Sequence, residues 1–255
     1  GGEWNSVVKN HADADIKIAL AFPDTYSIGM SHLGIQILYG LLNERKDTAC
    51  ERVFAPLDDM EALMRKHKIP LFSLETYTPL KEFDIIGFSL QYELSYTNIL
   101  NMIDLAEIPV MASERGETEP LVIAGGPTAI SPEPLADFID LFLIGDGEES
   151  LPHLVELWKG MNQKKLSRKE KIVSLAQTLK NVYAPSLYEV IYHQDNTIQE
   201  IRPRISGLPS PIRSASVRDL NKTYFATKPL VPYVKTVQGR ITIEVMRGCT
   251  QGCRF

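Results

Sequence analysis

Short apolar runs alternate with amphipathic segments through the first 180 residues of the chain. Five of the runs have the length and apolarity of buried strands, at residues 16–22, 51–55, 85–90, 121–124 and 141–144. Strands that alternate with helical segments are typical of βαβ units, in which the strands are parallel and helices cover the sheet. The pattern therefore predicts an α/β fold with a Rossmann-like parallel sheet and flanking helices.

Between the strands, apolar residues recur at spacings of three and four, which places them on one face of a helix. The first such face consists of Met30, Leu33, Ile37 and Leu41. Further helices are expected at residues 59–66, 97–106, 134–138 and 164–180, and Ser150 is the expected N-cap of a helix that runs to Trp158. The basic residues of the 164–180 segment are expected to form a solvated helix face.

The pattern changes after Tyr183. Two apolar segments, 187–192 and 198–202, flank a polar turn, which predicts a β-hairpin. A proline-rich passage follows and is expected to be an extended linker. The alternating, β-branched run at 241–245 predicts one more strand. We therefore expect three parts: an α/β domain at 1–180, the hairpin and linker at 181–238, and the start of a second domain at 239–255.

Glycines and polar residues gather at the carboxyl ends of four predicted strands, where open parallel sheets bind their ligands. The candidate binding residues are Asp24, Tyr26 and Gly29 after the first strand, Ser89 and Leu90 after the third, Gly125 and Gly126 after the fourth, and Gly145 and Gly147 after the fifth. A single glycine at a strand end is an ordinary turn residue. Four such loops on one edge, however, predict a groove for a flat or phosphorylated ligand near backbone amides.

The composition is that of a globular protein, with 44% hydrophobic residues, 23% charged residues and a net charge of −5. This acidic balance argues against a large nucleic-acid surface. No apolar run approaches the ~18 residues of a membrane span, and no secretory leader is recognisable, so we expect no membrane partner. Three cysteines give no even disulfide framework, and reduced thiols indicate the cytoplasm.

Three residues have a structural interpretation beside a functional one. His32 follows the first loop and could contact a ligand, although a capping or surface position at the start of a helix is favoured. Cys50 is expected to be a small buried residue rather than a ligand. Glu148 lies at a predicted helix N-terminus, where the helix dipole alone explains a carboxylate.

Cys249 and Cys253 lie four residues apart on a glycine-bearing loop after the last predicted strand. Two thiols at this spacing can bind one soft metal centre, and iron–sulfur is favoured over zinc. The run from Arg247 to Phe255 resembles the start of the radical S-adenosylmethionine (SAM) signature, Cys-x-x-x-Cys-x-aromatic-Cys. The resemblance implies that Cys249 and Cys253 bind a [4Fe–4S] cluster, that Phe255 lies beside S-adenosylmethionine, and that a third cysteine follows. We therefore expect the inactive front part of a larger enzyme, whose partner is its own C-terminal radical SAM domain.

The loops at the sheet edge resemble those of the cobalamin (B12)-binding domain, a flavodoxin-type fold whose loops read Asp-x-His-x-x-Gly, Ser-x-Leu and Gly-Gly. Asp24 and Gly29 match the first loop and Ser89 the second, whereas Tyr26 replaces the cobalt-ligating histidine. A phenol at neutral pH is a poor ligand compared with an imidazole. The resemblance therefore implies either cobalamin bound without a lower axial ligand from Tyr26, or a domain that has lost the cofactor and kept the fold.

Longer stretches, among them residues 22–34, 54–61, 87–98 and 123–127, resemble an uncharacterised family of bacterial radical SAM proteins with an N-terminal cobalamin-binding-like domain. Two functions remain open. Either the domain binds a corrinoid or helps to dock substrate in a radical SAM iron–sulfur enzyme, or it is a cofactor-free scaffold of an enzyme that acts on RNA or protein. A flavin carrier is disfavoured, because the first loop lacks a phosphate cradle.

Overall fold

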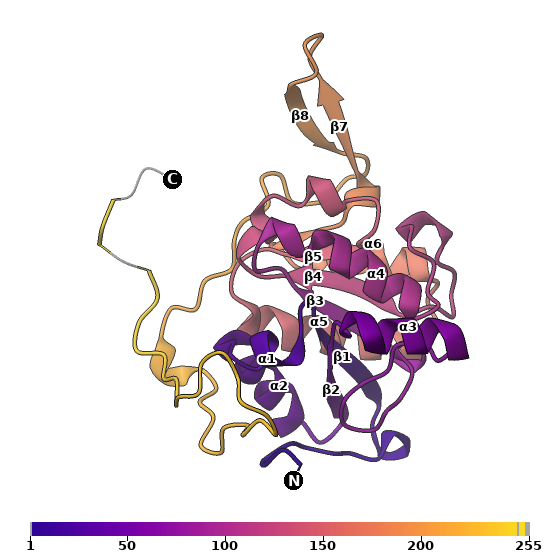
Figure 1. Cartoon of the computed structure of the whole chain (residues 1–255). Coiled ribbons are helices and arrows are strands. Elements are labelled where there is room, and N and C mark those ends of the chain that lie inside the picture. The colour runs from indigo at the N-terminus through magenta and orange to yellow at the C-terminus, as the bar shows by residue number, and fades with distance from the viewer. Residues whose placement is uncertain (1, 249, 253–255) are drawn as a thin grey trace.

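The computed structural model describes residues 2–248 and 250–252, and Figure 1 shows a central sheet with helices packed against it. Six strands pair in the order β2-β1-β3-β4-β5-β6. The first five strands are parallel, and β6 pairs antiparallel with β5. Their bounds are β1 Ile16–Phe22, β2 Thr48–Phe54, β3 Ile85–Ser89, β4 Leu121–Gly125, β5 Leu141–Leu143 and β6 Val182–Tyr183. The predicted α/β fold is confirmed, and the five predicted strands differ from the observed ones only at their ends.

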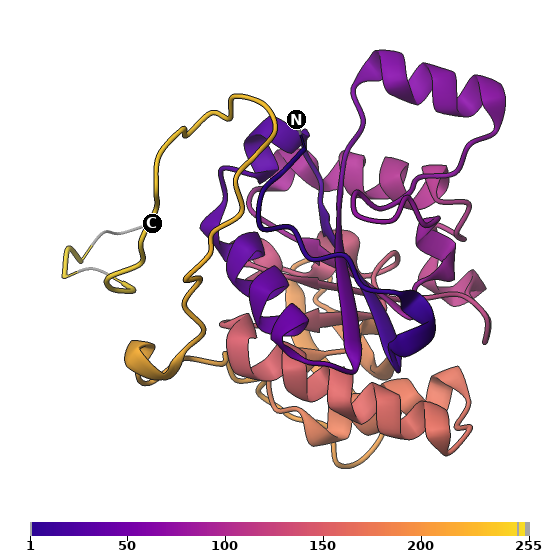
Figure 2. The same cartoon turned by 90° about the horizontal axis from the view of Figure 1, so that it is seen from below.

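Helices cover both faces of this sheet. On one face α2 contacts α5, and α5 contacts α6. On the other face α3 is joined to α4 by ion pairing and hydrogen bonding of Arg65 with Asp104 and Asn101. Figure 2 shows the sheet between these two layers. The helices are α1 Tyr26–Gly29, α2 Leu33–Glu44, α3 Asp58–His67, α4 Tyr96–Leu105, α5 Gly147–Gln163 and α6 Arg168–Thr178.

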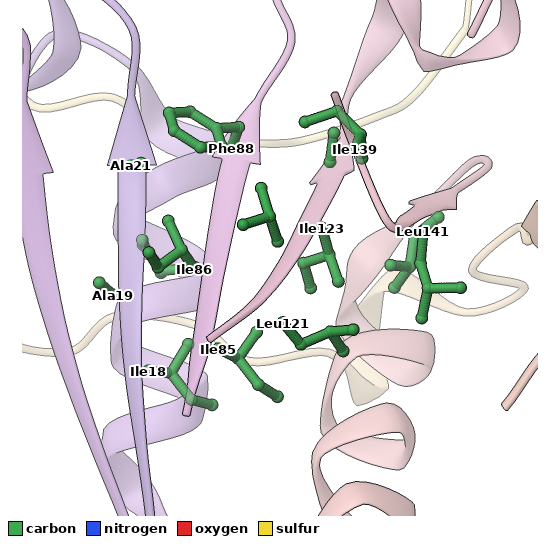
Figure 3. Packing of buried hydrophobic residues seen from close by; sticks show 14 of the residues in the cluster. Ile18, Ala19, Ala21, Ile85, Ile86, Phe88, Leu121, Ile123, Ile139 and Leu141 are labelled. Atoms are coloured by element: carbon green, nitrogen blue, oxygen red, sulfur yellow. The ribbon is translucent and has the colours of Figure 1, made fainter. Parts of the chain in front are cut away.

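The core lies along the parallel strands because both of their faces are covered, which is why these strands read as nearly continuous apolar runs. Ile18 of β1 pairs with Ile85 of β3, which in turn pairs with Leu121 of β4. All three side chains are buried, and Figure 3 shows them side by side across the sheet. Each such side chain contributes roughly 1.5–3 kcal/mol by leaving water, so this row holds the three strands in register.

Two of the predicted helix boundaries are wrong. The 134–138 segment forms a single 3-10 turn at Glu133–Leu135 instead of an α-helix. The helix expected to have Ser150 as its N-cap begins four residues earlier, with Asp146 in the N-cap position, and it runs to Gln163 rather than to Trp158. Ser150 is inside the first turn, where its hydroxyl donates to the Asp146 carbonyl at 2.7 Å. A hydroxyl that bonds back to the preceding turn does not cap the helix.

The predicted face of α2 is also only partly correct. The fully buried residues of α2 are Ile35, Tyr39 and Leu42, whereas Leu33 and Ile37 are only partly buried. Those two side chains line two cavities, one at the carboxyl ends of the strands and one toward residues 220–244. The second of these cavities has a volume of about 660 Å³ and lies between α2 and residues 220–244. The helix is therefore apolar on two sides, and periodicity alone does not tell which side meets the sheet.

One residue of the basic helix is not solvated as expected. α6 begins with a capping box between Ser167 and Glu170. Its first residue, Arg168, is buried, and its guanidinium donates to the Asp140 carboxylate at 2.8 Å. The same Asp140 oxygen accepts from Arg115 at 3.0 Å and from the Val122 amide at 2.8 Å. This buried cluster joins α6 to β4 and to the residue just before β5.

The predicted hairpin is confirmed as β7 (Tyr188–Tyr192) and β8 (Ile198–Pro203), which project from the body in Figure 1. The strand predicted at 241–245 is not formed, and Ile241 and Val245 are 81% and 83% exposed. A strand requires a ladder partner, and no part of the described chain pairs with this run. Among the residues that the structure describes, no helix has the length and apolarity of a membrane span.

The Asp140 cluster yields a stability prediction. Asp140→Ala would leave two buried guanidinium groups without their carboxylate, so we expect a loss of about 3–5 kcal/mol in the free energy of unfolding. Urea denaturation measures this loss. As the control, Glu107→Gln breaks the exposed pair with Lys81 and is expected to cost less than about 1 kcal/mol. Equal losses in the two variants would show that the cluster does not stabilise the fold.

Candidate ligand cavity at the sheet edge

A cavity of about 490 Å³ opens at the carboxyl edge of the parallel strands. It is lined from β1 by Leu20 and Ala21, from β3 by Gly87 to Ser89, and from the far side by residues of α2. In the sheet, β2 lies on one side of β1 and β3 lies on the other, so the strand order reverses between β1 and β3. The cavity lies at this point of reversal. Ligands of open α/β sheets bind at this point.

The walls of the cavity are mostly apolar. Leu33, Ile37 and Leu38 of α2 face Ile123, Leu143 and other strand residues across it. A few polar groups interrupt this surface, among them Ser89 and Gln91, whose amide nitrogen donates to the Ser89 hydroxyl at 2.7 Å. An apolar cavity with few polar groups suits an organic ligand that is recognised at a small number of atoms.

Two glycines shape the rim because other chain segments pass close to them. Gly126 has φ +115°, and a Cβ there would lie 2.6 Å from the Leu90 carbonyl oxygen. Gly145 has φ +92°, and a Cβ there would lie 2.2 Å from the carbonyl oxygen of Ala215 in the linker. A side chain at either position would meet both backbone strain and a collision. These glycines are therefore explained by packing, whether or not a ligand is bound.

His32 is a cavity residue whose favoured interpretation from sequence was wrong. It occupies the N-cap position of α2, but its side chain makes no capping hydrogen bond. The imidazole packs against the Phe22 ring, with 4.9 Å between centroids, and lines the cavity. Burial lowers the pKa of His32 below its usual value, because the charged form loses hydration. The cavity wall therefore carries a neutral imidazole at pH 7.

The residues of the first loop lie elsewhere. The Asp24 carboxylate accepts a hydrogen bond from the Tyr92 hydroxyl at 3.0 Å. The Tyr26 hydroxyl donates to Glu3 at 2.5 Å, and burial together with Glu3 raises the pKa of this phenol. Gly29 packs so closely on Phe54 that a Cβ would lie 2.4 Å from its ring. Asp24, Tyr26 and Gly29 are absent from the cavity wall.

A group of charged residues surrounds the mouth of the cavity. Arg247 forms an ion pair with Asp146 at 3.1 Å and donates hydrogen bonds to Glu244 at 2.7 and 2.9 Å and to Glu148. The hydrogen bonds that Glu244 and Glu148 accept, that of Glu244 first, raise the pKa of Arg247 above its ordinary value. No sequence motif predicts this group, since Arg247 and Glu148 are 99 positions apart. The linker contributes Ser214 to the same mouth.

The cysteines divide into one that the structure describes and two that lie outside the described residues. Cys50 is buried in β2, and burial raises its thiol pKa well above the usual value, as expected of a packing residue. Cys249, Cys253 and Phe255 fall outside the described residues. Within the described part of the chain, no three His, Cys, Asp or Glu side chains come together as a metal site.

Of the residues predicted to bind a cofactor, the structure gathers five around one cavity: Ser89, Gly125, Gly126, Gly145 and Gly147. Leu90 is completely buried beneath the rim, and its amide donates to the Gly125 carbonyl at 2.7 Å. Ligand binding by any of these residues stays a prediction. Their common location follows from the strand order, which brings the ends of β3, β4 and β5 to one edge.

The fold and the cavity define a doubly wound α/β domain with a ligand-sized cavity at its switch point. Residues 34–185 match the family described as "Radical SAM proteins, N-terminal", and the chain belongs to this family. It is also similar to "Uncharacterized protein MJ0966" of Methanocaldococcus jannaschii, with 23% identity over 240 residues. That alignment covers 93% of this chain and 40% of the relative, so the chain spans less than half the relative's length. No solved structure matches the chain.

The position of His32 yields a prediction about pH. Because the folded-state pKa is lowered, the unfolded chain binds the proton more readily, and stability should fall as pH drops below about 6.5. We expect the titration midpoint of the His32 ring, followed by NMR, to lie below about 6.5. His32→Gln should reduce the loss of unfolding free energy between pH 7 and pH 5, while His193→Gln in the exposed hairpin should leave it unchanged. Equal pH slopes in all three proteins would contradict a buried, neutral His32.

Proposed function

We propose that this domain binds a flat organic cofactor, a corrinoid in the first instance, as the N-terminal part of a radical SAM iron–sulfur enzyme. The observation that supports the proposal is the apolar cavity at the switch point, whose rim combines Ser89 with Gly125 and Gly126. Ser89 matches the serine of the Ser-x-Leu loop of the cobalamin-binding domain, with the leucine displaced by one position to Leu90, and Gly125 and Gly126 match its Gly-Gly loop.

The dimensions of the cavity suit part of a corrinoid rather than the whole. A volume of about 490 Å³ accommodates a nucleotide-sized group, so the macrocycle itself would lie outside the mouth. Gly87 lines the floor of the cavity and has no side chain to fill it. The space there is sufficient for a Cβ, which would lie 3.5 Å from Leu20 and 3.6 Å from Ile123, both ordinary contact distances. The imidazole of His32 and the side chains of Ser89 and Gln91 would then hydrogen-bond the polar atoms of the inserted group.

Tyr26 does not suit the role of a cobalt ligand. Its hydroxyl is engaged by Glu3, and its raised pKa keeps the phenol protonated at neutral pH. Its ring is stacked on Tyr233 of the linker, with 4.3 Å between centroids. We therefore propose that a corrinoid binds without an axial ligand from this position, and that Tyr26 holds the linker against α1 instead.

The iron–sulfur part of the proposal depends on family membership and on the donor set. Thiolates at Cys249 and Cys253, four residues apart, suit two ligands of a [4Fe–4S] cluster, with a third ligand still required. Such a cluster supplies the electron for reductive cleavage of S-adenosylmethionine. The role that we propose for this chain is to hold the cofactor and to present it to the cysteine-bearing segment.

A second candidate function is a cofactor-free scaffold for the radical SAM domain. It is favoured by the contacts that hold the linker to the body: Trp4 pairs with Val231, Tyr26 stacks on Tyr233, and Asp146 binds the Val217 amide at 2.7 Å. In this role the partner is the enzyme's own radical SAM domain, and the substrate is RNA or protein. The net charge of −5 gives RNA no support.

Titration with hydroxocobalamin separates the two functions. We expect saturable binding with a dissociation constant in the micromolar range, followed by the visible spectrum and by tryptophan fluorescence. Gly125→Val and Gly87→Val should each weaken binding by about 10-fold, or about 1.4 kcal/mol, because the added methyl groups fill the cavity. Both glycines have ordinary φ angles and room for a Cβ, whereas Gly126 does not, so folding should survive.

Gly160→Val is the matched control, since Gly160 lies in α5 and a Cβ there meets nothing within 4 Å. Its affinity for hydroxocobalamin should equal that of the wild type. Absence of binding to the wild-type chain at millimolar corrinoid would overturn the cofactor proposal and favour the scaffold. Equal weakening by all three valine variants would show that the corrinoid binds outside the cavity.

A further inference from the structure

The segment just before Cys249 is attached to the body at one place. Residues 241–246 have no regular structure, and the side chains of Ile241, Val245 and Met246 are exposed. Within the described part of residues 241–252, every hydrogen bond comes from the side chain of Arg247. The placement of this segment therefore depends on a single guanidinium.

The guanidinium is bound on all three of its nitrogens. Nη1 lies 3.1 Å from Asp146 Oδ2, Nη2 donates to Glu148 Oε1, and Nε donates to Glu244 Oε1 at 2.7 Å. Glu244 lies in the same segment, whereas Asp146 is the N-cap residue of α5 and Glu148 lies in the first turn of that helix. The planar fork of an arginine suits several carboxylates at fixed angles, which a lysine ammonium does not reproduce.

The burial of the partners makes this contact more than an ordinary surface pair. Exposed ion pairs contribute little, because solvent screens them and ordering two long side chains costs entropy. Here the side chain of Glu148 is only 9% exposed, and that of Arg247 is 27% exposed. Glu148 also lies in the first turn of α5, where the helix dipole favours a carboxylate. Removing Arg247 would leave three carboxylates together without a counter-charge.

The loop that binds Arg247 also holds the linker and the cavity mouth. Ala215 donates its amide to the Ile144 carbonyl at 2.9 Å, and the Asp146 amide donates to the Ala215 carbonyl at 3.0 Å. The Asp146 carboxylate in turn accepts from the Val217 amide. Asp146, Glu148 and Arg247 all line the cavity. Residues 145–148, which lead from β5 into the first turn of α5, therefore contact the linker, the segment before Cys249 and the space for a ligand.

We infer that Arg247 is a positioning residue that fastens the cysteine-bearing segment to Asp146 and Glu148 at the mouth of the cavity. Asp146, fixed by the linker, and Glu148, fixed by α5, form a rigid receptor for the guanidinium. The fastening holds the residues that directly precede Cys249 in the sequence beside the cavity. It requires no bound ligand, so it is independent of the corrinoid proposal.

The test is the ps–ns mobility of the segment in the 255-residue chain, measured by backbone ¹⁵N relaxation. In the wild type, the order parameters of Val245 and Arg247 should approach the value of about 0.85 that is typical of rigid backbone. In Glu148→Gln and Arg247→Gln they should fall below about 0.6, the range of flexible segments. Arg247→Lys should give intermediate values, because the charge remains and the fork is lost.

Two matched controls accompany these variants. Glu149→Gln removes an exposed carboxylate from the same helix turn, and Arg240→Gln removes an exposed arginine from the same segment. Both should keep the wild-type order parameters, and all variants should keep the wild-type melting temperature to within a few degrees. Low order parameters in the wild type, or equal values in Glu148→Gln and Glu149→Gln, would overturn the inference.

A measurement of hydroxocobalamin binding by the same variants separates this inference from the proposed function. If the fastened segment closes the mouth, Arg247→Gln should weaken hydroxocobalamin binding by about 5-fold or more, since two events at one loop are reciprocally coupled. Failure of the wild-type chain to bind hydroxocobalamin would count against the corrinoid alone. The order parameters would still decide whether Arg247 fastens the segment.

Discussion

The parallel register of the strands is the constraint on which the site depends. Ser89 at the end of β3 pairs with Gly125 at the end of β4, which pairs with Leu143 just before Gly145. Loops from distant parts of the sequence are therefore held within one edge before any ligand is considered. The antiparallel β6 closes the sheet beyond β5 and runs away from this edge, and the chain returns to it with the linker at Ala215. The cavity is thus a product of strand order, and its chemistry is supplied by the loops.

Charge is distributed in two distinct ways in this domain. Asp140 lies in the core with Arg115 and Arg168. Both guanidinium groups donate hydrogen bonds to the Asp140 carboxylate and to backbone carbonyl oxygens, so the cluster serves to join elements. The group around Arg247 lies at the surface, where solvent and ligand can reach it. A cluster of the first kind joins elements within the core, whereas a cluster of the second kind fastens a segment of the surface to the domain. This difference is why the cavity mouth, rather than the core, is the place for a positioning contact.

The sequence was sufficient for the sheet because buried parallel strands leave an unmistakable apolar run, as at Ile16–Phe22. It was insufficient wherever contacts between distant parts of the chain decide which side chains are buried. The two apolar sides of α2 cannot be ranked without knowing that the linker covers one, and the burial of Arg168 depends on Asp140, 28 positions away. For the site, motif positions located the glycine rim but not the imidazole. His32 lies six residues beyond the position where the cobalamin pattern has its histidine, and only the path of the chain into α2 brings it to the cavity.

The first loop shows how a sheet edge can change its role without losing its shape. Asp24 and Gly29 keep the spacing of the cobalamin loop, but Gly29 is required by the ring of Phe54, and Asp24 is held by Tyr92. With tyrosine at position 26, the side chain is long enough to reach Glu3 and Tyr233, which a histidine at this position would not bridge in the same way. The loop then secures the N-terminal segment and the linker, while the cavity is left to the loops after β3, β4 and β5. A domain divided in this way can keep a ligand in the cavity and position a downstream segment at its mouth, because the two tasks use different loops and share only residues 145–148.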